Sequence, residues 1–231
     1  AVSATNLSIA GAVAKASADA ITANTVIADG ASMLVSSSYA HNGNLTVGGG
    51  TSGSLDVTSA TVSVTGDFVL DAGTTFGTVI NSATQDDAGK VVATGNVAVS
   101  ADSTIDVTVA SFSGIADGVT YKIIEGSAGT VALPTVTDSS TKVEFVASTA
   151  GSDLTLTTQI AAITDWFTDL TPNATAVVGV LDDVLPADAE LFGALLDIED
   201  KAEFQDAVES MAPDMSGAVM SVGRSASRQA V

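Results

Sequence analysis

Hydrophobic and polar residues alternate along the first 160 residues of the chain, and a helical spacing of apolar residues replaces this alternation afterwards. The alternation is clearest at residues 44–47, 54–57, 61–64, 103–109 and 153–157. A period of two is typical of β-strands with one buried face, and short polar or glycine turns separate these segments. The pattern therefore predicts a mainly β protein with a short α-helical segment at its C-terminal end.

The repetition of short strands favours a coiled arrangement of residues 1–115. The segments leave no room for crossover helices, and they recur without strict sequence identity. We predict a right-handed parallel β-helix, a solenoid in which about 20 to 25 residues form each coil and neighbouring coils lie about 4.8 Å apart. The alternative is a β-sandwich, because the same glycine turns would suit its hairpins.

Residues 116–160 contain longer strands with larger side chains, which predict a β cap on the stem. The last coil of a β-helix presents an unpaired edge to which other chains can add strands. We expect the apolar side chains of Tyr121, Ile123, Phe145 and Leu154 to cover this edge. The cap would thereby protect the end of the stem.

Residues 161–231 carry apolar residues at helical spacing. The first predicted helix begins at Thr171 and Pro172, a favoured start because the missing N–H of proline would be unpaired there anyway. Val178 and Leu181 belong to its apolar stripe, and Pro186 ends it. Helices this short are marginal in water, so their apolar stripes require a packing partner.

Three more helices are expected after the first. The second would start near residue 188 and bury Leu195, and the third would begin at the capping residue Asp200 and bury Phe204. A fourth is expected at residues 215–228. Before all of these, Trp166 and Phe167 stand close to Ile160 and Ile163, and we expect them to form the hydrophobic seam between the cap and the helices.

Composition favours a thin, elongated core. Hydrophobic residues make up 46% of the chain but aromatic residues only 4%, so small side chains dominate the interior. Cysteine is absent, which excludes disulfides and thiolate chemistry. No stretch approaches the roughly 20 apolar residues of a membrane helix. A secretion signal is not visible either, so we expect any such segment to have been removed or to lie outside these residues.

The chain is strongly acidic, with a formal net charge of −20. This charge excludes nucleic acids and anionic membrane surfaces as partners, because nothing could neutralise phosphates. The charge is typical of a solvated surface, and the alternative is calcium binding. The dense carboxylate groups at 86–87, 182–183 and 197–200 do not have the spacing of known calcium loops, so we predict no metal.

Candidates for catalysis are few, and we predict no enzyme and no cofactor. The sole histidine, His41, is expected in a surface turn, and no Gly-x-Ser-x-Gly motif accompanies it. Gly48, Gly50 and Gly53 match Gly-x-Gly-x-x-Gly, but a strand rather than a helix follows them. The alternative is glycan hydrolysis by one of two carboxylate pairs, which are Asp67 with Asp71 and Asp102 with Asp106.

Two regions of the sequence resemble a known family. Residues 118–125, 143–145 and 151–157 look like the end of a passenger domain of a Gram-negative autotransporter, and 170–185, 191–196 and 204–219 are similar to the helical segment that precedes its membrane barrel. The resemblance implies that 116–160 is an autochaperone-like cap, which seeds folding of the stem during export. It also implies that 161–231 is a linker into an outer-membrane barrel, which these residues do not include.

The sequence thus leads to a non-enzymatic stem, secreted to the cell surface of a Gram-negative bacterium. Its partner would be the barrel domain of the same protein or neighbouring copies of the chain. The alternative is a self-assembling extracellular structural protein, a filament or layer whose helices dock on the next subunit. A third class, an adhesin that binds a glycan or protein through the stem, stays open at this level.

Overall fold

The computed structural model describes residues 1–49, 52–81, 84, 88–112, 115–138, 140, 142–184 and 189–211. The protein is mainly β, with 51% strand and 17% helix. It divides into two compact units, Ala1–Ala161 and Ala162–Val231, which are described separately below. The fourth helix predicted at 215–228 and the carboxylate pair at 86–87 lie outside the described residues.

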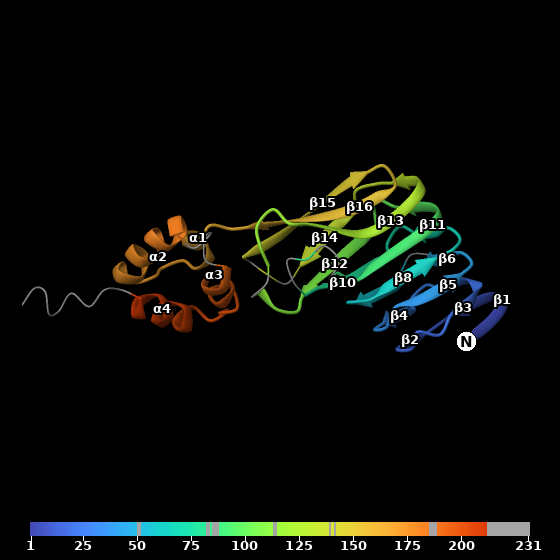
Figure 1. The fold of residues 1–231 in the computed structure, drawn as a ribbon, viewed down its shortest axis with the longest axis horizontal. Coiled ribbons are helices and arrows are strands. Elements are labelled where there is room, and N and C mark those ends of the chain that lie inside the picture. Colours follow the sequence, from blue (N-terminus) through green and yellow to red (C-terminus); the bar gives the residue numbers. More distant parts are fainter. Residues whose placement is uncertain are drawn as a thin grey trace, which may run out of the picture. The chain divides into compact units, whose positions relative to one another are not determined.

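The first unit contains two sheets, A and B (Figure 1). Sheet B has six strands in the order β14-β12-β10-β7-β4-β2, and sheet A has ten, in the order β15-β16-β13-β11-β8-β5-β3-β6-β9 with β1 beside β3. The strands of sheet B are β2 (Ala12–Lys15), β4 (Ser32–Val35), β7 (Ser54–Thr58), β10 (Thr75–Ile80), β12 (Thr104–Val109) and β14 (Thr135–Asp138). Those of sheet A are β1 (Val2–Ile9), β3 (Ile21–Ile27), β5 (Tyr39–Asn42), β6 (Leu45–Val47), β8 (Thr61–Val64), β9 (Phe68–Leu70), β11 (Lys90–Val99), β13 (Thr120–Val131), β15 (Val143–Ala150) and β16 (Asp153–Ile160).

Every pairing among strands β1 to β14 is parallel, as the alternating pattern predicted for the stem. In sheet B, Val13 pairs with Met33, Met33 with Leu55, Leu55 with Phe76, Phe76 with Ile105 and Ile105 with Val136. The four central side chains of this column are fully buried. Hairpins of an antiparallel sandwich are not formed by these strands, so that alternative is wrong for this region.

In strands β3 to β9, buried residues occupy every second position. The Leu-x-Val segments show this directly, because Leu45, Val47, Leu55 and Val57 are all buried. Parallel pairing continues beyond residue 115, through β13 and β14, and only β15 and β16 are antiparallel. Aliphatic side chains form most of this core, and the buried aromatic rings are Tyr39, Phe68, Phe76, Tyr121 and Phe145.

The second unit contains four described helices: α1 (Ile163–Trp166), α2 (Pro172–Val184), α3 (Ala189–Leu196) and α4 (Lys201–Ser210). Helix α2 starts at the proline that the sequence indicated. Its residues Ala174, Val178 and Leu181 are buried at the spacing of one helix face, and Val177 is half-buried. The segment expected to end this helix at Pro186 lies outside the described residues.

Candidate functional site

The edge of strand β13 is the place where sheet A changes from parallel to antiparallel pairing. One edge of β13 pairs in parallel with β11, and its first five residues pair on the other edge with β16, Thr120 opposite Thr157 and Ile124 opposite Leu154. Strand β15 then pairs with β16 over its whole length, from Val143 to Ala150. A two-stranded hairpin therefore covers part of the last parallel edge of the sheet.

The interior side of this closure is apolar. Tyr121 and Ile123 from β13, Phe145 from β15 and Leu154 from β16 are each exposed by no more than 2%. All four residues that the sequence indicated for the cap therefore lie inside the first unit. Ile124 and Leu156, which were not singled out, are also fully buried beside them.

Polar contacts hold the hairpin at its turn. The Asp153 carboxylate accepts a hydrogen bond from the Gly126 N–H at 3.1 Å and forms an ion pair with Lys122 Nζ at 3.1 Å. This carboxylate raises the pKa of Lys122, first by the hydrogen bond and then by its charge. Ser152 Oγ donates to the Gly126 carbonyl at 2.5 Å. The hairpin turn is thereby fixed to the point where β13 leaves the covered edge.

A second set of contacts holds the other end of the hairpin. Thr158 Oγ1 donates to the Ala116 carbonyl at 2.6 Å and accepts from the Val119 N–H at 3.0 Å. The Ile160 N–H donates to Asp117 Oδ1 at 2.9 Å. Side chains thus bond both ends of β16 to the segment around β13. These bonds fix the register of β16 against β13 together with the backbone hydrogen bonds between the two strands.

The helical unit has its own aromatic cluster. The ring of Trp166 lies 5.8 Å from that of Phe192 and 5.9 Å from that of Phe204, and Phe167 lies 4.9 Å from Phe204. Trp166 and Phe167 were expected to form a seam with the cap, and the contacts described for them join helices within this unit. Leu195 and Phe204 are buried there as well, as are Val178 and Leu181.

Side-chain caps order these helices. Asp200 accepts hydrogen bonds from the N–H groups of Ala202 and Glu203, each at 2.9 Å, which confirms the predicted start of α4. Thr171 Oγ1 accepts from the Ala174 N–H at 3.2 Å at the start of α2. Asp182, one of the carboxylates weighed for calcium, accepts from the Ile163 N–H at 2.9 Å. That carboxylate therefore serves the start of a helix.

A ladder of Asn and Asp side chains runs along one corner of the first unit. Asn24 Oδ1 accepts from the Asn44 N–H at 3.0 Å, Asn44 Oδ1 from the Asp67 N–H at 2.9 Å, and Asp67 Oδ1 from the Asn96 N–H at 2.7 Å. We call these four residues the Asx ladder. Each bond joins one parallel strand turn to the next, so the corner is held by a repeated side-chain contact that the sequence analysis missed. The available signal was a glycine before the last three members, at positions 43, 66 and 95.

The expectation that His41 lies in a surface turn is wrong. His41 belongs to strand β5, its side chain is completely buried, and its Nε2 lies 3.1 Å from the Asn44 carbonyl oxygen. Tyr39, two residues earlier, is buried on the same side of the strand, with its ring edge-on to the imidazole at 6.1 Å. The alternation of buried and exposed residues in β5 therefore continues to Asn42, closer to the turn at Gly43 than we expected.

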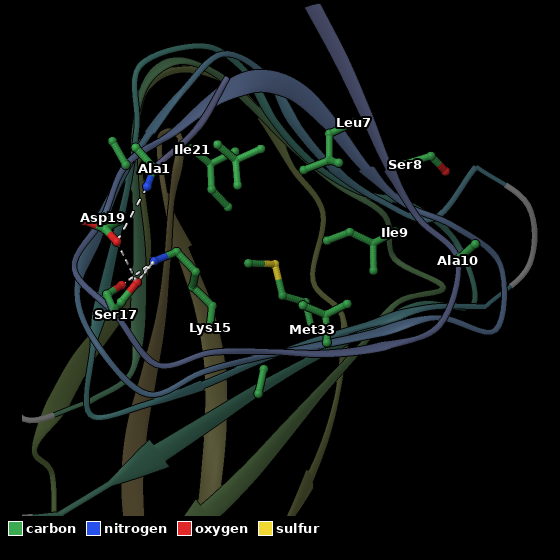
Figure 2. A pocket seen from close by; sticks show the side chains of 14 residues that line it. Ala1, Leu7, Ser8, Ile9, Ala10, Lys15, Ser17, Asp19, Ile21 and Met33 are labelled. Carbon is green, nitrogen blue, oxygen red and sulfur yellow. Dashed lines mark hydrogen bonds and ion pairs between the residues drawn. The ribbon is translucent and has the colours of Figure 1, made fainter. Parts of the chain in front are cut away.

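The N-terminal end of the parallel ladder is more open than the closure at β13. Strands β1 and β2 pair with β3 and β4 on one side only, among the residues that the structure describes. Figure 2 shows a hollow of about 470 Å³ at this end, lined by Ile9, Ile21 and Met33 among others. Val13 at its rim is 45% exposed. Lys15 lies along the wall of the hollow, where its Nζ donates to Ser17 (Figure 2) and lies 4.8 Å from the centroid of the Tyr39 ring.

The carboxylates weighed for glycan hydrolysis have other surroundings. Asp67 belongs to the Asx ladder. Asp106 lies two strands from Asp56 in sheet B, with Gly77 between them, and burial followed by the Asp106 charge raises the pKa of Asp56, which Ser54 partly offsets. Within the described parts of the chain, no three His, Cys, Asp or Glu side chains come together in a way that could hold a metal ion. Asp56 and Asp106 each accept a hydrogen bond from a hydroxyl of sheet B, Asp56 from Ser54 at 3.2 Å and Asp106 from Thr137 at 3.1 Å.

Comparisons with known proteins give no further assignment. The chain matches no protein-family model and no curated protein. Among the described helices, none has the length and apolar character needed to cross a membrane.

Proposed function

We propose that the chain is a non-enzymatic stem of a secreted protein on a Gram-negative cell surface, similar to the membrane-proximal end of an autotransporter passenger. In this proposal residues 1–138 wind as a right-handed parallel β-helix. The hairpin of β15 and β16 is its folding cap, and the helical unit leads towards an outer-membrane barrel. The protein would then contribute to its own export and folding.

The change of pairing at β13 carries this proposal. The parallel pairs of the stem join residues far apart in sequence, such as Val62 with Val91, so the loop-closure entropy of each pair is large. The hairpin instead pairs Ala150 with Asp153 across a tight turn at Gly151, which has a φ of 68°. Local pairs form faster than non-local ones. A hairpin that is formed first offers β13 a template, from which parallel pairing can spread towards the N-terminal end.

Refolding kinetics of two matched variants test this order of events. Leu154 in the hairpin and Leu55 in the middle of sheet B are both completely buried leucines. Leu154→Ala and Leu55→Ala should each destabilise the first unit by about 2–5 kcal/mol. If the hairpin seeds folding, Leu154→Ala slows refolding in proportion to the lost stability, and Leu55→Ala mainly speeds unfolding. The reverse distribution between folding and unfolding rates would exclude a seeding role for the hairpin.

A second candidate function is self-assembly into an extracellular structural layer or filament. The observation that favours it is the one-sided pairing of β1 and β2, with the partly exposed Val13 at the rim of the hollow. Such an edge can accept a strand of another chain. Sedimentation velocity would show mass growing with protein concentration, and Val13→Lys should abolish this growth. A single monomeric species at all concentrations would exclude the candidate.

A further inference from the structure

The only histidine of the chain lies inside the open end of the parallel ladder. His41 has an exposed fraction of 0%, and in sheet A only β3 and then β1 lie between its strand and the free edge. On the other side of β5, sheet A continues through β8, β11 and β13 to the hairpin, and β6 and β9 follow the second half of β3. A change at His41 therefore acts on the part of the ladder that has the fewest neighbours.

The hydrogen bonds of His41 suit a neutral ring. With a proton on Nε2, the ring donates to the Asn44 carbonyl oxygen at 3.1 Å, while Nδ1 has no partner. A second proton would place a donor at Nδ1 without an acceptor in hydrogen-bond geometry, and it would add a buried charge. An unsatisfied buried donor and an unpaired buried charge are both costly.

The described strands that pair with β5 supply no acidic group that could balance this charge. The titratable or charged groups on the neighbouring strands are Tyr39, edge-on at 6.1 Å on the same strand, and Lys15 of β2, whose Nζ lies over the Tyr39 ring. Strands β3 and β8, which pair with β5, and strand β6, which follows Asn44, contain no Asp or Glu. Burial lowers the pKa of His41, although the carbonyl groups of Asn44 and Ala23 favour the charged ring.

We propose that His41 is an acid-sensitive latch, which opens the N-terminal strands β1 to β6 when its ring takes up a proton. In a stack of repeated units, each coil contacts only its neighbours, so the end coils can open while the rest stays folded. The strands from β11 to β16, which carry the hairpin closure, would stay paired. The inference concerns the opposite end of the unit and does not depend on the proposed role of the cap.

The direction and size of the effect follow from proton linkage. In an open coil the ring has its ordinary pKa of about 6.5, whereas in the closed coil its pKa is lower. The open form therefore binds more protons, and its population rises as the pH falls below about 6.5. The ordinary pKa of the open ring sets an upper limit of about 30-fold on the rise in the open population between pH 7.5 and pH 5. Above pH 7.5 the latch has no further effect.

Hydrogen exchange of the full chain, followed by mass spectrometry, tests the latch. After correction for intrinsic rates, peptides from residues 1–47 should exchange up to about 30-fold faster at pH 5 than at pH 7.5, and peptides from 143–160 should not. His41→Leu should remove this difference.

A second measurement keeps the test decisive if His41→Leu does not fold. The imidazole signals of the single histidine can be followed by NMR in the unmodified chain without assignment of any other residue. If the latch operates, the NMR signals of the protonated imidazole should appear only at pH values at which the amides of residues 1–47 exchange rapidly. A ring that titrates at about 6.5 in a fully protected ladder would overturn the inference, as would an equal acid response of residues 143–160.

Discussion

The glycines that accompany the Asx ladder allow the sharpest test of how the parallel strands of the first unit are held together. A Cβ atom added at Gly66 would lie 2.2 Å from Asn44 Oδ1 and 2.7 Å from the backbone carbon of Gly43. Both distances are shorter than any real contact, so the Asn44 side chain must move away and the neighbouring backbone must shift. Asn44 Oδ1 would then lose its bond to the Asp67 N–H.

We expect Gly66→Ala to destabilise the first unit by about 2–4 kcal/mol. The lost hydrogen bond contributes about 0.5–1.5 kcal/mol, and the forced backbone shift contributes about 1–3 kcal/mol. Gly11→Ala is the matched control, because no atom lies within 4 Å of an added Cβ there. The control should change the free energy of unfolding by no more than about 0.5 kcal/mol.

Urea unfolding of the full chain, followed by the β-sheet signal in circular dichroism, measures both variants. The single tryptophan, Trp166, belongs to the helical unit, so its fluorescence follows that unit separately. The expected result is a lower midpoint of the β-sheet transition for Gly66→Ala with an unchanged fluorescence transition. Equal stability of Gly66→Ala and Gly11→Ala would refute the close approach that we derive for this corner.

Three further predictions concern the closure, the helices and the surface charge. Phe145→Ala should lower the free energy of unfolding of the β unit by about 3–5 kcal/mol in the same urea experiment, without moving the Trp166 transition. Asp200→Ala should destabilise the helical unit by about 1 kcal/mol, read by Trp166 fluorescence, and Asp200→Asn should retain most of the stability. Because the folded-state pKa of Asp56 is raised, its charged form is disfavoured, and Asp56→Asn should stabilise the β unit at pH 7. Thermal unfolding at several pH values should show this gain shrinking as the pH falls through the raised folded-state pKa towards about 4, and no gain below that pH.

The parallel strands of the first unit could be predicted from the sequence because their burial repeats every two residues. Leu45 with Val47 and Leu55 with Val57 lie at strand positions whose neighbours are polar, so the buried face was evident before the pairing was known. Asp200 could be predicted as a cap for a similar reason, since Glu203 follows at the third helix position. These features depend on residues close in sequence.

The Asx ladder could not be predicted in the same way because its members meet only after the chain has turned. Asn44 and Asp67 are 23 residues apart, and Asp67 and Asn96 are 29 apart, so the interval is not constant. Each member alone looks like an ordinary turn residue, because Asn and Asp are common in turns of every kind. Only the parallel register brings the side-chain oxygen of one turn to the backbone N–H of the next.

His41 shows how a turn signal can hide the last residue of a strand. Asn42 and Gly43 form a strong turn signal, but Tyr39 and His41 share the interior face at strand spacing, and burial follows the strand. His41→Ala, harmless at a surface turn, should therefore cost about 2–4 kcal/mol in urea unfolding at pH 7.5, because it leaves a cavity and removes the partner of the Asn44 carbonyl. Tyr39→Phe, which removes an unpartnered buried hydroxyl, is the matched control and should be neutral or stabilising. Equal stability of His41→Ala and the unmodified chain would mean that the ring is not packed in this interior.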